Sequence, residues 1–73
     1  MGVTEDLADA LARDTIAAKE KLGDEDLIAK VAKELGATST TLEEAFMTSV
    51  RVRLAERRGR TFLKQYVTQH LKK

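Results

Sequence analysis

The chain has 73 residues, a mass of 8.1 kDa and no cysteine, and its 13 basic and 12 acidic residues leave a net charge of +1. This length allows one domain, residues 1–73, with a thin apolar core and no deep substrate cavity, and the absence of cysteine excludes disulfides and cysteine zinc sites. No apolar run approaches the roughly 18 residues of a membrane span, and the acidic start with Glu5 and Asp6 is unlike a secretory signal. We therefore expect a cytoplasmic protein without membrane contact.

Two helices are expected in the first half of the chain. The first covers about residues 4–22, with Thr4 as its N-cap, and the second covers residues 24–36, beginning at the capping residue Asp24. The glycines at 23, 36 and 59 each follow a helical pattern, which predicts a left-handed C-cap at all three. The apolar face of the first helix consists of Leu7, Leu11, Ala18 and Leu22, flanked by Ala8, Ala12 and Ile16, and that of the second of Leu27, Ile28, Val31, Ala32 and Leu35.

Two further helices are expected in the second half, with one alternative left open. After a polar turn over residues 37–41, Thr41 and Glu44 have the spacing of a capping box, and apolar residues recur at every fourth position from Leu42 to Leu54. A helix from residue 42 to about 58 is the preferred interpretation. Residues 49–54 also alternate apolar and polar, as a half-buried strand does, so a short hairpin around residues 50–62 stays possible. The last helix covers residues 61–71, with an apolar face of Phe62, Leu63, Tyr66, Val67, His70 and Leu71.

These elements predict an all-α fold, a small four-helix domain whose second and third helices form a helix-turn-helix-like pair. Such a pair needs a small residue where the helices cross, a glycine to reverse the chain and apolar residues to fix both helices. Ala32, Gly36 and Leu42 follow one another in that order. Residues 31–42, VAKELGATSTTL, resemble the corresponding stretch of helix-turn-helix regulators. The resemblance implies that the start of the second helix of the pair enters the major groove of DNA; by position these residues are Ser39, Thr40, Thr41 and Glu43, with Glu44 and Met47 one turn on.

The nearly neutral total charge hides an uneven distribution. Residues 1–37 carry nine acidic and five basic residues, a net charge of −4, whereas residues 38–73 carry eight basic and three acidic residues, a net charge of +5. Such asymmetry is typical of proteins that bind nucleic acid or an acidic partner. Residues 39–47 contain glutamates but none of the usual base-reading side chains, so phosphate contacts are expected from later residues. These are Arg51, Arg53, Arg57, Arg58, Arg60 and Lys64.

If residues 50–62 form a hairpin instead of a helix, residues 57–60 lie at its tip. That arrangement is similar to the wing of winged helix proteins or the basic arm of HU-type nucleoid proteins, so it also implies DNA binding. In a third interpretation, the arginines pair with the acidic half of the same chain or of a second copy, and no nucleic acid is involved.

No residue pattern indicates catalysis, a metal or a cofactor. His70 is the only histidine, so neither a serine–histidine pair with a third partner nor a metal site of His and Cys ligands is indicated. Glu43 and Glu44 are neighbours on an expected helix and therefore diverge. The acidic run at residues 24–26 lacks the other ligands of a calcium loop and is explained as a helix cap. We expect a non-enzymatic protein.

The sequence thus predicts a small DNA-binding protein, either a transcriptional regulator or a nucleoid-type protein. A homodimer is expected, because such proteins read paired half-sites about 34–36 Å apart. Its interface is expected at Phe62, Tyr66 and Leu71. The alternative is a helical protein–protein interaction module that self-associates or binds an acidic partner and has no nucleic-acid role.

Overall fold

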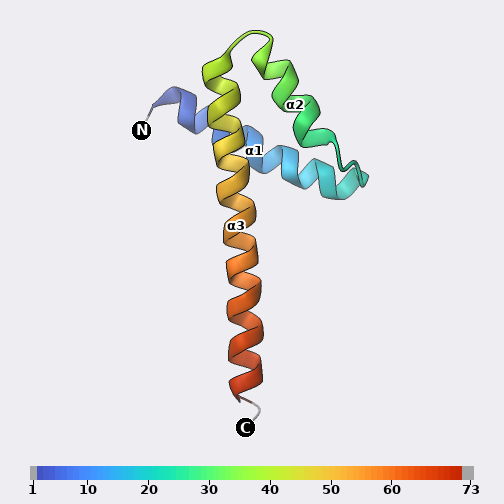
Figure 1. Ribbon diagram of the computed structural model, residues 1–73, viewed down its shortest axis with the longest axis vertical. Coiled ribbons are helices and arrows are strands. Elements are labelled where there is room, and N and C mark those ends of the chain that lie inside the picture. The colour runs from blue at the N-terminus through green and yellow to red at the C-terminus, as the bar shows by residue number, and fades with distance from the viewer. Residues whose placement is uncertain (1, 72–73) are drawn as a thin grey trace.

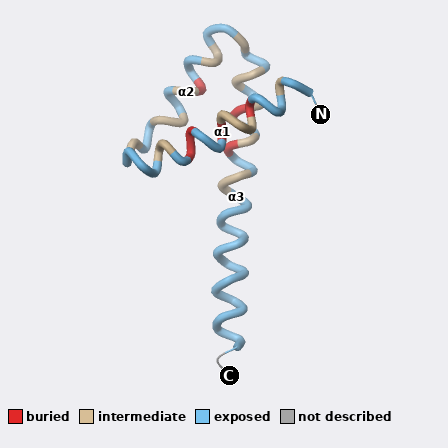
Figure 2. Tube along the Cα trace, turned by 180° about the vertical axis from the view of Figure 1, so that it is seen from behind, coloured by how far each residue is buried: buried red, intermediate tan, exposed pale blue. Residues whose placement is uncertain are grey.

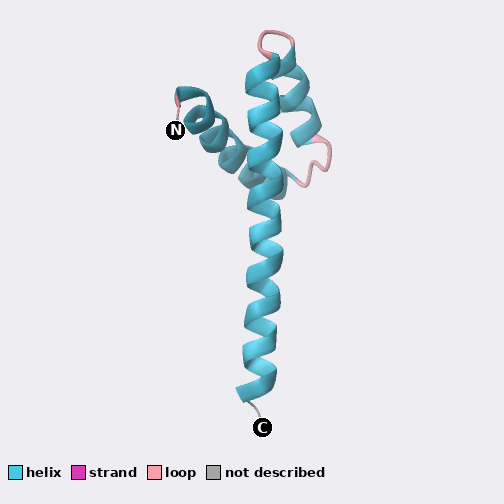
Figure 3. Ribbon diagram, turned by 60° about the vertical axis from the view of Figure 1, so that its left-hand side comes forward, coloured by secondary structure: helices cyan, strands magenta, loops and turns pink. Residues whose placement is uncertain are grey.

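Three helices make up the fold, and the prediction of an all-α protein is confirmed. The computed structural model describes residues 2–71, with helices α1 (Val3–Leu22), α2 (Leu27–Gly36) and α3 (Thr40–Leu71). In Figure 1, α1 crosses α3 and α2 returns from the far end of α1 to the start of α3. Figure 3 shows α2 lying beside the first part of α3, with only short loops between the helices. The expected count of four helices is wrong.

The third and fourth expected helices are one continuous helix. α3 runs through Gly59, whose backbone is not left-handed, and the expected C-cap there is wrong; so is the alternative of a hairpin around residues 50–62. Glycine permits a left-handed cap but does not force one, and no proline follows it to end the helix. Continuing the helix keeps the backbone hydrogen bonds that a break would lose. An ion pair between Glu56 and Arg60, four residues apart, also spans the glycine.

The helix starts differ from those expected. α1 begins with Gly2 as N-cap, whose N–H donates to Glu5 Oε1 at 3.1 Å, rather than with Thr4. At α3, the Leu42 N–H donates to the Ser39 hydroxyl at 3.1 Å, so the helix starts before the expected capping box at Thr41. At the helix ends, Gly23 is the left-handed C-cap of α1 as expected, with φ 68°, whereas Gly36 is the last residue of α2 and is not left-handed.

The core is small and is built around the first part of α3. Phe46 and Val50 of α3 meet an alanine-rich face of α1, and α2 closes the third side. The buried face of α1 is rotated by part of a turn from the predicted one. Leu7 and Leu22 are exposed, whereas the residues expected beside the face, Ala8, Ala12 and Ile16, are buried. Alanines let α1 approach α3 closely, which explains why this face is preferred. The buried apolar residues are Ala8, Ala12, Ile16, Ala32, Phe46 and Val50.

The apolar tertiary packing lies in residues 3–54, which we call the head; beyond this range, Arg57 adds an ion pair to Glu20 of α1. Residues 55–71 of α3, the distal segment, are exposed at every position, and Figure 2 shows them projecting away from the head. The radius of gyration is 15.4 Å, whereas a compact domain of this length has about 11 Å. The accessible surface is 5706 Å², against about 4,500 Å² expected for a folded monomer of this mass. The molecule is therefore a small head with a bare helical extension.

Candidate interaction surface

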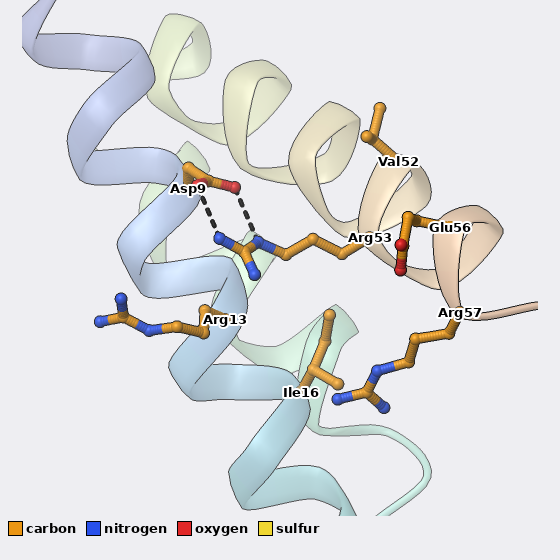
Figure 4. Close-up of a pocket in the computed structure, with 7 residues that line it drawn as sticks. All are labelled: Asp9, Arg13, Ile16, Val52, Arg53, Glu56 and Arg57. Atoms are coloured by element: carbon orange, nitrogen blue, oxygen red, sulfur yellow. Dashed lines mark hydrogen bonds and ion pairs between the residues drawn. The ribbon is translucent and has the colours of Figure 1, made fainter. Parts of the chain in front are cut away.

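Two of the predicted phosphate-binding arginines lie in ion pairs between α3 and α1. Arg53 donates from Nε and Nη2 to the two carboxylate oxygens of Asp9, each at 2.7 Å, and Arg57 pairs with Glu20. In Figure 4 both arginines extend from α3 toward α1. The hydrogen bonds from Arg53 hold the pKa of Asp9 below its usual range, and Asp9 in turn raises the pKa of Arg53. These two ion pairs link α3 to α1.

An open groove of about 370 Å³ lies beside these ion pairs, between α1 and α3. Its lining consists mainly of the charged groups just described, together with Arg13, Ile16, Val52 and Glu56 (Figure 4). Glu56 pairs with Arg60 and Asp9 with Arg53. Because the carboxylates already have cationic partners, the groove offers no uncompensated acidic charge.

Three of the predicted basic residues remain free of ion pairs within residues 2–71. Arg51, Arg58 and Lys64 are exposed on α3 and have no acidic partner in this part of the chain. Arg51 and Arg58 are seven residues apart and share one side of the helix, whereas Lys64 lies on another side. Arg60 is held by Glu56.

The predicted base-reading residues lie at the other end of α3. Ser39 caps the helix through its hydroxyl, and Thr40 and Thr41 are exposed in the first turn. Along a straight α-helix, Thr41 and Lys64 are roughly 35 Å apart, from the 1.5 Å rise per residue. The structure therefore does not bring the turn and the distal cations into one compact surface.

The most prominent feature of α3 is an apolar surface that nothing in the described chain covers. It contains a ladder of rings in which Phe62 and Tyr66 have centroids 6.0 Å apart and Tyr66 stacks on His70 at 4.0 Å. His70 Nδ1 also lies 2.9 Å from the Tyr66 carbonyl oxygen. We call the large apolar residues of this surface the distal stripe; they are Phe62, Leu63, Tyr66, Val67 and Leu71, each between 44% and 78% exposed.

The distal stripe is not an extension of the face that packs in the head. At about 100° per residue, the stripe is centred roughly 150° around the helix from the side chains of Phe46, Val50 and Leu54. The same helix thus carries two apolar faces that point in different directions. α1 and α2 cover the face of Phe46, Val50 and Leu54, and no described residue covers the distal stripe. The sequence pattern identified both faces but placed them on separate helices, with Phe62, Tyr66 and Leu71 of the second face as the expected dimer interface.

Comparisons with models of known families, with curated proteins and with solved structures give no match for this chain. In residues 2–71 no helix is both long enough and apolar enough to cross a membrane. The same residues contain no group of three or more His, Cys, Asp or Glu side chains placed to hold a metal ion. The uncovered stripe and the three unpaired cations are therefore the features from which a function can be argued.

Proposed function

We propose that this protein is a helical interaction module that presents the distal segment of α3 to a protein partner. The observation that carries this proposal is the exposure of the distal stripe. Soluble monomers rarely expose contiguous apolar patches of this kind without an interaction role. Four of its members fall within six positions, Phe62 to Val67, which concentrates the exposed apolar area on one side of two helical turns; these members are Phe62, Leu63, Tyr66 and Val67.

The marginal stability of a lone helix supports the proposal. Beyond Arg57, residues 58–71 make no tertiary contact, so this end of α3 is held only by its own backbone hydrogen bonds and helix propensity, which are marginal in water. Gly59 in its interior weakens it by about a further 1 kcal/mol relative to alanine. Contact with a partner would provide the stability that the segment lacks. The stripe spans roughly half of the helix circumference, so a helical partner can contact it over a broad face.

Hydrogen exchange tests the division of the chain into a stable head and a partner-dependent segment. In the dilute monomer, amides of residues 60–71 should exchange nearly as fast as in an unfolded peptide, whereas those around Phe46 and Val50 should be strongly protected. The double variant Leu63→Asp, Tyr66→Asp should leave the head amides unchanged, and so should the control Gln65→Asp, Gln69→Asp on another side of the helix. Protection of residues 60–71 equal to that of the head in a verified monomer would show that no partner is needed, and would refute the proposal.

A second candidate function is binding to duplex DNA through phosphate contacts. It is favoured by Arg51, Arg58 and Lys64, which are exposed and have no ion pair in the described part of the chain. A contact of these three cations with about three phosphates should weaken roughly 40-fold between 50 and 200 mM salt. The turn residues Ser39, Thr40 and Thr41 would supply any base reading in this case.

Charge reversal at the free arginines separates the two candidates. Arg51→Glu with Arg58→Glu should abolish DNA binding if it exists, because two unpaired phosphate-binding cations become acidic. The fold should be unaffected, since neither residue takes part in the ion pairs to α1. The matched control is Arg13→Glu, which changes an exposed arginine on α1. No salt-dependent shift with duplex DNA at low salt would exclude this candidate and leave the protein-binding one in place.

A further inference from the structure

Building on the proposed interaction function, we propose that the partner is a second copy of this chain. The two α3 helices would cross antiparallel, with their distal stripes in contact and the two Gly59 residues facing each other at the crossing point. This arrangement is argued from the position of Gly59, from the sizes of the side chains on either side of it, from charge and from surface area.

Gly59 has no role within one chain that would require glycine. Its backbone is helical rather than left-handed, and a Cβ added there would meet nothing within 4 Å. At about 100° per residue, Gly59 lies near the middle of the arc occupied by the distal stripe. A glycine on a contact face removes the side chain that would otherwise hold a second helix away. Its position therefore marks a place where another helix can approach closely.

The side chains on either side of Gly59 are complementary in size for an antiparallel pair. The small or mid-sized Ala55 and Val52 precede Gly59 by four and seven residues, and the large Leu63 and Tyr66 follow it by the same intervals. Antiparallel crossing at Gly59 places each small side chain opposite a large one of the second copy. A parallel pair in register would instead put large side chains against large ones and leave a gap at Gly59.

Charge favours the same direction. Residues 57–71 contain four cations and no acid: Arg57, Arg58, Arg60 and Lys64. Two such segments side by side in parallel would repel along their length. In the antiparallel pair, each basic segment runs toward the head of the other copy, whose residues 3–54 contain 11 acidic and 7 basic residues. A second copy thus supplies both the apolar surface and the opposite charge.

The available area matches what a dimer needs. Each chain exposes about 1,200 Å² more than a compact monomer of its mass. A standard protein interface takes about 800 Å² from each partner. Burial of the distal stripes against each other would bring the exposed surface of each copy toward the normal range.

Disulfide trapping tests the direction of crossing, and the absence of native cysteine makes single-cysteine variants unambiguous. A mixture of Val52→Cys and Tyr66→Cys chains should form a mixed disulfide. Tyr66→Cys alone should not, because its two copies would be roughly 21 Å apart along the helices, far beyond disulfide reach. Gln65→Cys, on another side of the helix, is the control that should remain reduced in either arrangement.

Substitution at the crossing point tests the role of Gly59. Gly59→Leu should raise the helicity of the isolated chain, because leucine is a better helix former, yet it should weaken dimerisation at least about tenfold by blocking close approach. Thr61→Leu also improves helix propensity but lies away from the stripe, so it should leave the dimer intact. Sedimentation of the full chain at a series of concentrations measures both. Unchanged or tighter association of Gly59→Leu would refute the crossing at Gly59.

The remaining outcomes distinguish this inference from the function on which it rests. Rapid disulfide formation by Tyr66→Cys alone would refute the antiparallel arrangement and leave the interaction function standing. A chain that stays monomeric up to roughly 1 mM, with freely exchanging amides at residues 60–71, would exclude a second copy as the partner. A monomer whose residues 60–71 are as protected as the head would refute both the inference and the proposed function.

Discussion

The two phenylalanines show how position on a helix decides the role of a residue. Phe46 is fully buried and Phe62 is 67% exposed, although both lie on α3 within apolar patterns. They are 16 residues apart, which turns their side chains about 160° away from each other at 100° per residue. Phe46 therefore points at α1 and α2, whereas Phe62 points away from them. The buried side chain determines whether the head folds, and the exposed one is available for a partner.

Replacing Phe46 or Phe62 by alanine should affect the stability of the dilute monomer very differently. Phe46→Ala should lower the free energy of unfolding by about 3–5 kcal/mol, which is as much as so small a core provides. We expect it to be largely unfolded by circular dichroism. Phe62→Ala is the matched control and should leave the urea midpoint of the head unchanged. An equal loss of stability in both variants would contradict the separation of core and stripe.

The link between α1 and α3 depends on charge as well as on apolar packing. The contact face of α1 is largely alanine, and alanines provide little apolar area. The ion pairs of Asp9 with Arg53 and of Glu20 with Arg57 lie at the edge of this contact. Each pair joins an acidic side chain of α1 to a basic side chain of α3 and so favours one position of α1 along α3. Half-exposed pairs of this kind are weak individually, so their effect should be sought through pH.

The pH dependence of stability should carry a contribution from Asp9. Because Arg53 lowers the pKa of Asp9 in the folded state, this carboxylate stabilises the fold above its unfolded pKa of about 3.9. The contribution is lost as the pH falls through the lower folded-state value. Asp9→Asn should therefore be less stable than the parent at pH 7, and the difference should shrink at the acidic end of a urea-midpoint titration. Glu44→Gln, which removes an exposed carboxylate without an ion pair among the described residues, is the control; an equal pH effect there would contradict the assignment to Asp9.

At the scale of the whole molecule, the chain is more extended than a compact domain of its length. Its longest dimension is 55 Å and its shortest 13 Å, and the distal half of α3 accounts for the difference (Figure 1). A head with six buried apolar residues has little stability to spare. Association through the distal stripe would therefore contribute to the stability of the entire chain, because partner binding stabilises the folded state by mass action.

The thermal midpoint should accordingly rise with protein concentration if the partner is a second copy. Each tenfold increase above the dissociation constant adds about 0.7 kcal/mol per chain, or roughly 3–5 °C for a domain of this size. The double variant Leu63→Asp, Tyr66→Asp should show a midpoint that is independent of concentration, whereas Gln65→Asp, Gln69→Asp should behave like the parent. A parent midpoint that does not change with concentration would contradict self-association.

The sequence by itself determined the helical class, the boundaries of α1 and α2 to within a few residues, and the every-fourth apolar pattern that buries Phe46 and Val50. These features depend on local propensity and on periodicity, which can be read along the chain. It also identified the cations of α3 and the apolar residues after Gly59, but not which of them would be free.

Only the tertiary structure decided three further matters. It showed that α3 continues through Gly59, that Arg53 and Arg57 pair with Asp9 and Glu20, and that the stripe after Gly59 faces away from the head. The ion pairs join residues 37 and 44 positions apart, and the rotation between the two apolar faces exists only once the helix is continuous. Local sequence patterns cannot specify either, because both depend on where separate segments lie relative to one another in space.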